Sequence, residues 1–327
     1  MSVATVDAAN TERFVHPALF YADISDYVAG TVPFIEQGLS ADEPVAVAVP
    51  GPNLRVLRDA LGRAAAARVR MLDMTEVGAN PGRIIPGVLR AFADAHPDRH
   101  VRIIGEPIWP GRTEWEYPAC AQHEALINHA FTGRNVTILC PYDTAGLTPQ
   151  VLADARATHP TLLDRSGQYA SDQYDPDRVI SGYNQPLPLP HSVAEIVVDS
   201  PSAVTDARRF ATTHARGLGL SEDRLTDLEL AVAELVTNSV DHGGGTGLLR
   251  IWSDAHQVIC EVTDSGQLTD PLAGRRPATP NQPRGRGLLL VNHIVDLVRI
   301  HTNDTSTTIR VHLRLPTSST MATGTSA

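Results

Sequence analysis

The sequence predicts an α/β protein with two domains, an N-terminal doubly wound, mostly parallel sheet and a C-terminal α/β sandwich. The chain has 327 residues and 42% hydrophobic content, which is enough for two separate cores. Strand-like apolar runs alternate with helical stretches in the first half, as in parallel sheets covered by helices. A polar, proline-rich stretch then interrupts the alternation. We therefore predict domains at residues 14–163 and 193–315, a linker at 164–192, and a disordered Ser/Thr-rich tail at 316–327.

The first predicted domain consists of strand-like runs that are each followed by a helical stretch. The strands are expected at residues 18–23, 44–50, 69–74, 101–106 and 136–143, and the helices at 26–39, 53–62, 82–95, 120–131 and 149–157. Doubly wound sheets bind their ligands beyond the carboxyl ends of the strands. Acidic and aromatic residues follow these ends and predict a pocket for a small, partly apolar ligand, although ordinary turns give the same pattern. The candidate pocket residues are Asp73, Glu106, Trp109, Tyr142 and Asp143.

The second predicted domain contains a long helix from Ser221 to His242. The Ser221 hydroxyl is expected to cap the first amides, and the carboxylates that follow it favour the positive end of the helix. Apolar residues at i, i+3 and i+4 spacing predict a buried stripe, and three glycines end the helix. Glu234 and Asn238 lie one turn apart on the other side, with Asp241 and His242 a further turn along.

A carboxylate and a carboxamide on one helix face suit phosphoryl transfer. The carboxylate can accept the proton of an attacking hydroxyl group, and the amide oxygen can ligate the Mg²⁺ ion that bridges the phosphates. Taken alone, the pair is more typical of a solvated helix face than of a catalytic site.

Two strand-like runs follow, at residues 247–252 and 257–264, and the second ends at Asp264 with Gly266 close behind. A carboxylate at this place can bind the amino group of adenine, and the glycine lets the base approach the backbone. An ordinary turn is the alternative interpretation.

A loop rich in Pro, Gly and Arg leads to Gly285 and Gly287, immediately before a predicted helix at 288–298. Glycines at a helix N-terminus expose amides that bind phosphate, so this loop is a candidate triphosphate lid. Strands at 297–301 and 307–315 are expected to complete the domain.

The segments ELAVAELVTNSVDHG, DSG, RGRGLLLV and TTIRVHL occur in this order along the second domain. They resemble the N, G1 and G2 boxes and the terminal threonine of the GHKL ATPase superfamily, and their spacing is similar to that of its anti-sigma factor serine kinases. The resemblance implies ATP and Mg²⁺ as cofactors. It also implies that Glu234 is the catalytic base, Asn238 the Mg²⁺ ligand and Asp264 the carboxylate that reads adenine.

The same resemblance implies further contacts with the nucleotide. Gly266 would lie beside the adenine, Gly285 and Gly287 would form the hinge of the lid, and Thr308 would help to hold the adenine through water. The predicted nucleotide site is completed by Asp241, His242, Arg286 and Leu288.

The first domain contains the segments HPALFYADISDYV, FIEQGLSADEPVAVAVP, GEPIWPGR and LCPYDTAGL, which resemble the MEDS sensory domain of bacterial and archaeal regulators. The resemblance spans residues 14–163 and implies a RecA-like fold without a working phosphate loop. All 27 basic residues are arginine, which agrees with this, because a Walker A loop requires a lysine. A Schiff-base mechanism is excluded for the same reason.

Together the two resemblances imply a serine kinase under sensory control. It would phosphorylate an anti-anti-sigma partner of the STAS type and bind a sigma factor when that partner is absent. Two alternatives stay open: a non-catalytic module that sequesters a sigma factor, and a small-molecule receptor whose ATP site has decayed. A homodimer is also left open.

A histidine kinase is not expected. Such enzymes carry their phosphorylated histidine on a two-helix hairpin directly before the ATP domain. Here the proline-rich stretch and one predicted helix, at residues 205–218, occupy that place. Neither His191 nor His214 lies in a suitable hairpin.

The composition argues against several other classes. The net charge of −10 and the lack of a basic run argue against direct nucleic-acid binding, and no apolar stretch is long enough to predict a membrane span. Cys120, Cys140 and Cys260 are far apart, so we predict neither a disulfide framework nor a zinc site, but reduced thiols in a cytoplasmic protein.

One predicted helix carries His123, Glu124 and His129. His123 and Glu124 are weighed as ligands but are expected to be structural. A metal site of His123 with His129 is less favoured still, because their spacing turns the two rings to different faces of the helix.

Overall fold

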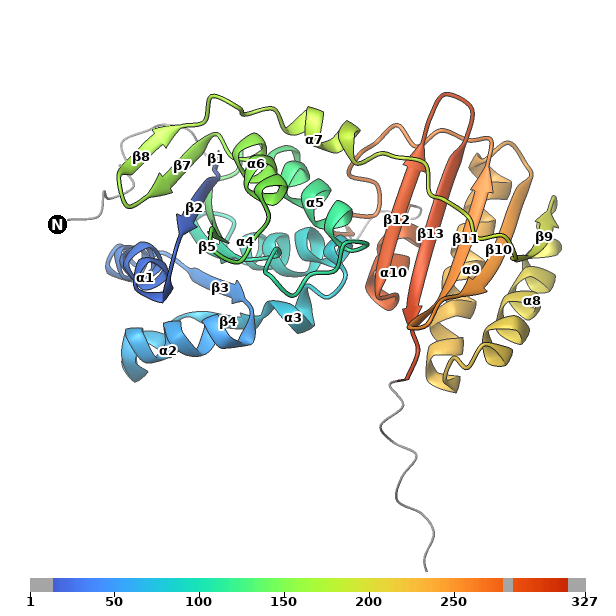
Figure 1. Cartoon of the computed structure of the whole chain (residues 1–327), viewed down its shortest axis with the longest axis horizontal. Coiled ribbons are helices and arrows are strands. Elements are labelled where there is room, and N and C mark those ends of the chain that lie inside the picture. The colour runs from blue at the N-terminus through green and yellow to red at the C-terminus, as the bar shows by residue number, and fades with distance from the viewer. Residues whose placement is uncertain (1–13, 279–284, 317–327) are drawn as a thin grey trace, which may run out of the picture. The chain divides into compact units, whose positions relative to one another are not determined.

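The computed structural model describes residues 14–278 and 285–316 and divides into two compact units, Met1–Tyr183 and Asn184–Ala327 (Figure 1). The first unit contains a mixed, mostly parallel sheet, and the second contains a separate antiparallel sheet. The α/β class and the mostly parallel N-terminal sheet predicted from the sequence are therefore confirmed. The predicted tail at 316–327 falls almost wholly outside the described residues.

The sheet of the first unit has the strand order β4-β3-β5-β6-β2-β7-β8, with β1 also paired to β6. Every pair in it is parallel except β7 with β8. The strands are β1 (Phe14–Val15), β2 (Pro17–Tyr21), β3 (Val45–Val49), β4 (Arg70–Asp73), β5 (Val101–Gly105), β6 (Val136–Asp143), β7 (Thr161–Asp164) and β8 (Gly167–Ala170). The central strands are buried on both faces, which explains their continuous apolar sequences.

Helices cover this sheet. They are α1 (Ile24–Ser40), α2 (Gly51–Ala66), α3 (Met74–Val77), α4 (Ala91–Asp94), α5 (Tyr117–Ala130), α6 (Pro149–Thr158) and α7 (Pro176–Gly182). On the face covered by α1 and α2, alternate residues of β3 such as Val45 and Val47 pack against Phe34 and Leu57 in one core cluster. Asp23 begins α1, since its carboxylate accepts hydrogen bonds from the amides of Ser25 and Asp26.

The β1 and β2 strands form one interrupted strand along β6. Phe14 pairs with Val136 and Ala18 pairs with Cys140, so both segments run parallel to the same neighbour. His16 lies at the interruption and is buried. The break therefore places an imidazole ring inside the unit, next to β6.

The predicted helix at residues 82–95 is wound in three different ways. A 3-10 turn at Pro81–Arg83 leads into a π-helix at Ile84–Arg90, and only the last turn, α4, is α-helical. Pro86 lies within the π-helical part and has no backbone N–H to donate to the preceding turn. The sequence pattern shows the apolar face of this segment, but not its winding.

The stretch predicted as a linker, residues 164–192, is largely built into the two units. It contains β8 and α7, and the Tyr183 hydroxyl donates a hydrogen bond to Asp154 of α6. Beyond the division after Tyr183, the Asn184 amide donates to the carbonyl of Thr302 at 2.8 Å and accepts from its N–H at 3.0 Å. Arg310 donates to the Leu187 carbonyl at 3.2 Å. The polar, proline-rich composition of residues 164–192 gives no sign of these contacts in the sequence.

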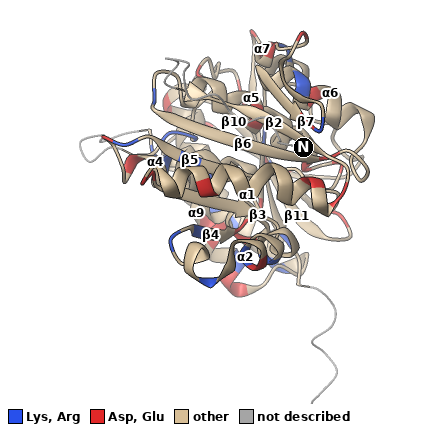
Figure 2. Cartoon of the chain, turned by 90° about the vertical axis from the view of Figure 1, so that its left-hand side faces the viewer, with Lys and Arg blue, Asp and Glu red and all other residues tan. Residues whose placement is uncertain are grey.

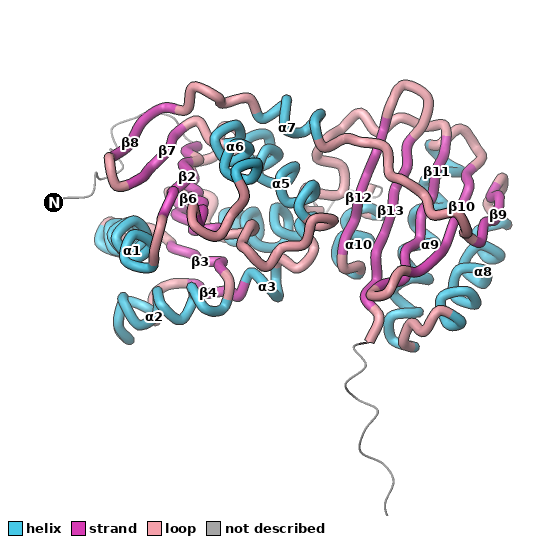
Figure 3. Tube along the Cα trace, in the orientation of Figure 1, coloured by secondary structure: helices cyan, strands magenta, loops and turns pink. Residues whose placement is uncertain are grey.

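The second unit is an antiparallel sheet of order β12-β13-β11-β10-β9 with its helices on one face (Figure 3). The elements are β9 (Ala194–Val198), α8 (Ala203–Gly217), α9 (Glu222–His242), β10 (Gly247–Ser253), β11 (Gln257–Asp264), α10 (Gly287–Ile294), β12 (Leu297–Thr302) and β13 (Thr307–Arg314). The predicted stripe of α9, which includes Leu225, Leu228 and Leu235, packs with β11 and β13 in one core cluster.

Two local expectations for this unit are wrong. Ser221 has the extended conformation of an N-cap residue, but its side chain makes no capping hydrogen bond. The helix predicted at 288–298 ends at Ile294, and the last apolar residues form the start of β12. A short apolar run favours helix and strand about equally, so the sequence alone does not locate this boundary.

No helix in the described ranges is long and apolar enough to cross a membrane. On the side drawn in Figure 2, acidic and basic residues are interspersed along the helices.

Candidate functional site

Helix α9 directs Glu234 and Asn238 toward the first turn of α10. Both side chains are partly buried and lie one helical turn apart. A Cβ atom built on Gly287, the first residue of α10, would lie 2.5 Å from Oε2 of Glu234 and 3.4 Å from Nδ2 of Asn238. The predicted acid and amide therefore meet the predicted glycine hinge in space.

The base of α9 is fixed to the far end of α10. Arg224 donates a hydrogen bond to the carbonyl of Ile294 at 2.9 Å and forms an ion pair with Asp296 at 2.6 Å. These contacts, together with the shared apolar core, hold the two helices in register. The position of Glu234 relative to the start of α10 is thus set by rigid elements.

Asp264 ends β11 and is held by its neighbours on both oxygens. The Ser239 hydroxyl of α9 donates to Oδ2, and the amide of Gly266 donates to Oδ1 at 2.9 Å. A Cβ on Gly266 would lie 2.8 Å from the carbonyl oxygen of His242 and 2.9 Å from the Cα of Gly243. Glycine is needed here because the backbone of the turn after α9 comes so close.

A cleft of about 450 Å³ lies between these segments. Of the residues predicted for the nucleotide site, those that line it are Asn238, His242, Asp264, Gly266, Gly285, Arg286, Gly287 and Leu288. Its wall also includes the loop after β11, where Asp270 and Gly274 lie. Part of the predicted lid, residues 279–284, lies outside the described residues.

The amino end of α10 is positioned by a side chain that the sequence analysis did not single out. Asn292 is buried, and its amide group donates to the carbonyl of Gly274 at 3.1 Å and to that of Leu288 at 3.0 Å. Gly274 has a φ of 69° and its Cβ would lie 2.6 Å from the Cβ of Leu288. The loop after β11 is therefore tied directly to the helix that borders the cleft.

Three predicted residues of the site do not line the cleft, and the first is Glu234, whose carboxylate lies beside Gly287. Thr308 faces away from the cleft and places its hydroxyl 3.1 Å from that of Thr263, whereas Thr307 lines the cleft and donates to the Gly266 carbonyl at 2.8 Å. Successive residues of a strand point to opposite faces, so an error of one position moves the side chain through the sheet. Asp241 is exposed and does not line the cleft.

In the first unit, Glu106 lies at the carboxyl end of β5 and is buried. Asn53 donates to both of its oxygens, at 3.0 and 2.9 Å, and the hydroxyls of Tyr21 and Tyr27 donate at 3.2 and 3.3 Å. Burial raises the pKa of Glu106 to about 8, although the hydrogen bonds from Asn53, Tyr21 and Tyr27 favour the charged form, and nearby Asp143 raises the pKa further.

The other predicted pocket residues do not all join Glu106. Asp73 begins α3 by accepting from the Thr75 amide, and Asp143 accepts from the amides of Ala145 and Gly146. Trp109 stacks under the guanidinium of Arg112. Tyr142 is buried and packs edge-on against the ring of His159, with the ring centroids 5.5 Å apart.

Comparison with known families identifies both units. Residues 15–160 match the family model of the MEDS domain, described as the methanogen/methylotroph, DcmR sensory domain, and residues 197–313 match that of the histidine kinase-like ATPase domain. The chain combines a MEDS domain with a histidine kinase-like ATPase domain. Both resemblances read from the sequence are thereby confirmed.

One curated relative of the ATPase domain is the serine-protein kinase RsbW of Halalkalibacterium halodurans. The two are 36% identical over an alignment of 100 residues, and the match covers 26% of this chain and 60% of RsbW. The chain thus spans 60% of the length of this relative.

Two solved structures show weaker likeness. One is the structure of the RsbU and RsbW domains of a Mycobacterium tuberculosis protein, which is 21% identical in the matched region. The match covers 38% of this chain and 33% of that one, and the TM-score is 0.30. The other is the histidine kinase domain of the E. coli osmosensor EnvZ, which is 17% identical in the matched region. The match covers 44% of this chain and 100% of that domain, and the TM-score is 0.24.

The residues of the ATPase domain that the sequence analysis missed are Thr307, Ser239 and Asn292. Thr307 could have been found from the alternation of side chains along a strand. Residues 307, 309 and 311 lie on the same face of β13, and the apolar Ile309 and Val311 mark that face as the one packed against the helices. Ser239 and Asn292 act through contacts with Asp264 and Gly274 that are distant in sequence, so no local pattern marks them.

Proposed function

We propose that this chain is an ATP-dependent serine kinase that phosphorylates a separate protein. The observation that carries the proposal is a cleft lined by Asn238 and Gly287 on one side and by Asp264 and Gly266 on the other. Glu234 does not itself line this cleft, but its carboxylate lies beside Gly287. The similarity of the ATPase domain to a serine-protein kinase supports it. We also infer that this domain has the Bergerat arrangement and that the MEDS domain has a RecA-like one.

The residues that border the cleft suit MgATP. The first N–H groups of α10 have no partner within the helix, so the amino end of this helix can stabilise an anion such as a phosphate. Glycine at position 287 places no side chain next to these N–H groups. Asn238 offers an amide oxygen, which is a ligand type that Mg²⁺ accepts. Asp264 presents a carboxylate that is already oriented by Ser239 and Gly266, as recognition of an adenine amino group requires. MgATP, when bound, supplies the phosphoryl group to be transferred.

Within this arrangement Glu234 has the role of general base. Its carboxylate lies beside the start of α10, where it can accept the proton of a partner's serine hydroxyl as that oxygen attacks. The products are ADP and phosphoserine on the partner, with the hydroxyl proton held by Glu234. Thr307 takes the adenine-side role first expected of Thr308, because its hydroxyl faces the cleft.

The partners we propose are an anti-anti-sigma protein of the STAS type as the phosphorylated substrate and a sigma factor as the alternative binding partner. The MEDS domain would control this choice by binding a small ligand. These proposals rest on the similarity to the serine-protein kinase RsbW, on the resemblance of the motifs to those of anti-sigma factor serine kinases, and on the presence of a sensory domain in the same chain.

The test mixes the full chain with MgATP and a candidate anti-anti-sigma protein and measures phosphoserine on that protein. Glu234→Gln is expected to lower the rate by about 10²- to 10⁴-fold while ATP binding, measured by calorimetry, is retained. Glu229→Gln is the matched control, because Glu229 lies on the same helix but pairs with Arg208 away from the cleft. Tight sigma-factor binding by a chain that transfers no phosphate would support the non-catalytic module instead. A chain without ATP binding would contradict both.

A further inference from the structure

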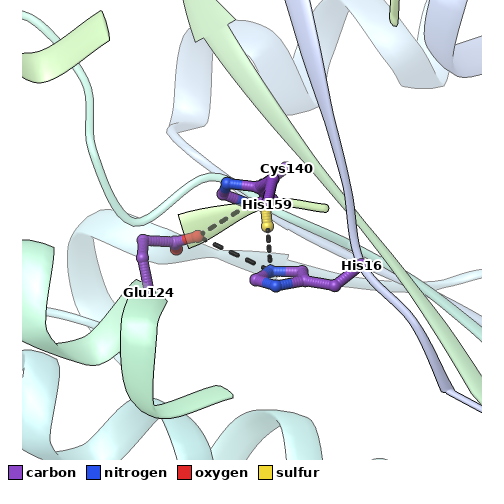
Figure 4. A group of neighbouring side chains, drawn as sticks. All are labelled: His16, Glu124, Cys140 and His159. Carbon is purple, nitrogen blue, oxygen red and sulfur yellow. Dashed lines mark hydrogen bonds and ion pairs between the residues drawn. The ribbon is translucent and has the colours of Figure 1, made fainter. Parts of the chain in front are cut away.

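Four buried side chains of the MEDS domain converge on one point outside both sites described above (Figure 4). His16 comes from the interruption between β1 and β2, Glu124 from α5, Cys140 from β6, and His159 from the residue after α6. One ligand atom from each lies within 4.8 Å of every other. The cluster thus joins four elements that are distant in sequence.

Three of the separations within the cluster are close to those of a tetrahedral metal site, and all of them are at most 4.8 Å. Sγ of Cys140 lies 3.4 Å from Nε2 of His16, and Oε2 of Glu124 lies 3.7 Å from the same nitrogen and 3.2 Å from Nε2 of His159. Zinc bonds of about 2.0 Å to nitrogen and 2.3 Å to sulfur give tetrahedral ligand-to-ligand distances of about 3.3 to 3.8 Å.

The outer nitrogens of both histidines are held as they are in metal sites. Nδ1 of His159 donates to the carbonyl of Ala155 at 2.8 Å. Nδ1 of His16 lies 3.2 Å from Oδ1 of Asn128. The amide nitrogen of Asn128 donates to the Thr158 carbonyl at 2.9 Å, which fixes the orientation of the amide group. Oδ1 of Asn128 therefore accepts a hydrogen bond from Nδ1–H of His16. Each neutral imidazole therefore carries its lone pair on Nε2, directed into the cluster.

The cluster is poorly satisfied by protein atoms alone. Both carboxylate oxygens of Glu124 and Nε2 of His159 are inaccessible to solvent and meet no hydrogen-bond criterion within the described part of the chain. The neighbours of the carboxylate are Nε2 of His159 at 3.2 Å and Nε2 of His16 at 3.7 Å. A buried carboxylate without hydrogen bonds is strongly destabilising. A cation bound among these atoms offsets that penalty and takes one ligand atom from each of the four side chains.

We propose that His16, Glu124, Cys140 and His159 bind one Zn²⁺ ion in the MEDS domain. A thiolate and two imidazoles favour zinc over Mg²⁺ or Ca²⁺, which prefer oxygen ligands throughout. Cys140 loses its thiol proton to solvent when the ion binds. With four protein ligands and no accessible position, the site stabilises the fold by tying β6 and the β1–β2 interruption to α5 and the start of β7.

The first experiment measures the zinc content of the full chain, purified without chelator, by elemental mass spectrometry. About one zinc ion per chain is expected, with at least about a tenfold lower zinc affinity in Cys140→Ser. Cys120→Ser is the matched control, because Cys120 is also a buried cysteine of this domain but lies outside the cluster. Equal zinc content in all three proteins would place the ion elsewhere and overturn the proposal.

A second measurement decides the matter if Cys140→Ser does not fold. Wild-type chain refolded with Co²⁺ in place of zinc is expected to show the visible bands of tetrahedral cobalt together with a thiolate-to-cobalt charge-transfer band in the near ultraviolet. Glu124→Gln is expected to keep the charge-transfer band but to shift the visible bands, because the sulfur ligand stays and an oxygen ligand changes. A folded wild-type chain that takes up neither Zn²⁺ nor Co²⁺, or that binds Co²⁺ without the charge-transfer band, would refute the site.

Discussion

Glu234 and Gly287 are in such close approach that a single methyl group on Gly287 would lie 2.5 Å from Oε2 of the glutamate. The two residues are far apart in sequence and come from the two helices that border the cleft. The glycine therefore does more than begin a helix. It leaves the space that the carboxylate occupies at the positive end of α10.

Gly287→Ala is expected to displace the Glu234 carboxylate and to lower phosphorylation of the partner by one to two orders of magnitude, on the order of the contribution of a positioned base. ATP affinity should change much less, because the amides of α10 remain. Phosphoserine formation and calorimetric ATP binding are measured on the same preparation. Gly217→Ala, at a helical glycine with open space around it, serves as the control. Equal loss of rate in both variants would contradict this role of Gly287.

Thr307→Val is expected to weaken ATP binding by about 2- to 10-fold, the effect of losing one hydrogen-bonding hydroxyl from the site. Thr308→Val removes the same group from the next residue, which faces the other side of the sheet, and should leave the affinity unchanged. Calorimetry on the two variants compares the faces directly. A larger effect at Thr308 would show that the register of β13 differs from the one described.

Gly266→Ala is expected to lower the free energy of unfolding of the ATPase domain by about 1 to 3 kcal/mol, as overpacking does elsewhere. The added Cβ would meet backbone atoms of His242 and Gly243 at less than 3 Å, and these cannot rotate away. Urea denaturation followed by circular dichroism measures the change. An alanine variant as stable as the wild type would mean that the turn after α9 is free to shift.

The pKa of Glu106 predicts a pH dependence for the MEDS domain. The folded value of about 8 lies above the ordinary value of 4.5, so the folded state binds more protons than the unfolded state between these two values. Stability from this group is therefore fully present below pH 4.5 and is lost as the pH rises toward 8, by about 1.4 kcal/mol for each pH unit between them. Glu106→Gln keeps the shape of the neutral acid and is expected to remove this dependence.

Tryptophan fluorescence can follow this effect in the full chain. In a Trp252→Phe background the remaining tryptophans, Trp109 and Trp115, both belong to the first unit. The urea concentration at the midpoint of unfolding is measured at pH 5 and at pH 8 for the Trp252→Phe protein and for the same protein with Glu106→Gln. Parallel declines in the two proteins would show that another group causes the pH dependence.

The sequence predicted most of the ATPase domain because its signals are local. The caps, stripes and glycines around Glu234, Asp264 and Gly287 each lie within a few residues of one another. The sequence did not show that Thr307 rather than Thr308 faces the cleft, because side-chain direction in a strand depends on register, which is set by pairing with β11. The winding around Pro86 and the attachment of residues 164–183 depend on tertiary packing, which no local pattern shows.

The zinc cluster was not predicted, for a related reason. Metal motifs are recognised by short spacings, whereas His16, Glu124, Cys140 and His159 are brought together only by the parallel pairing of β2 with β6 and β7. Glu124 was weighed as a ligand together with His123 but was expected to be structural, because such residues within an amphipathic helix more often are. A metal site of His123 with His129 was favoured less still. In the structure His129 is exposed and bonds to Asp177.

The two hydrogen bonds from Asn292 to Gly274 and Leu288 have a thermodynamic consequence for nucleotide binding. They order the base of the loop during folding, so the conformational entropy of these residues is lost before any nucleotide arrives. Association then needs little further ordering at the start of α10, and a chain lacking the Asn292 amide would bind the same ligand with a less favourable entropy.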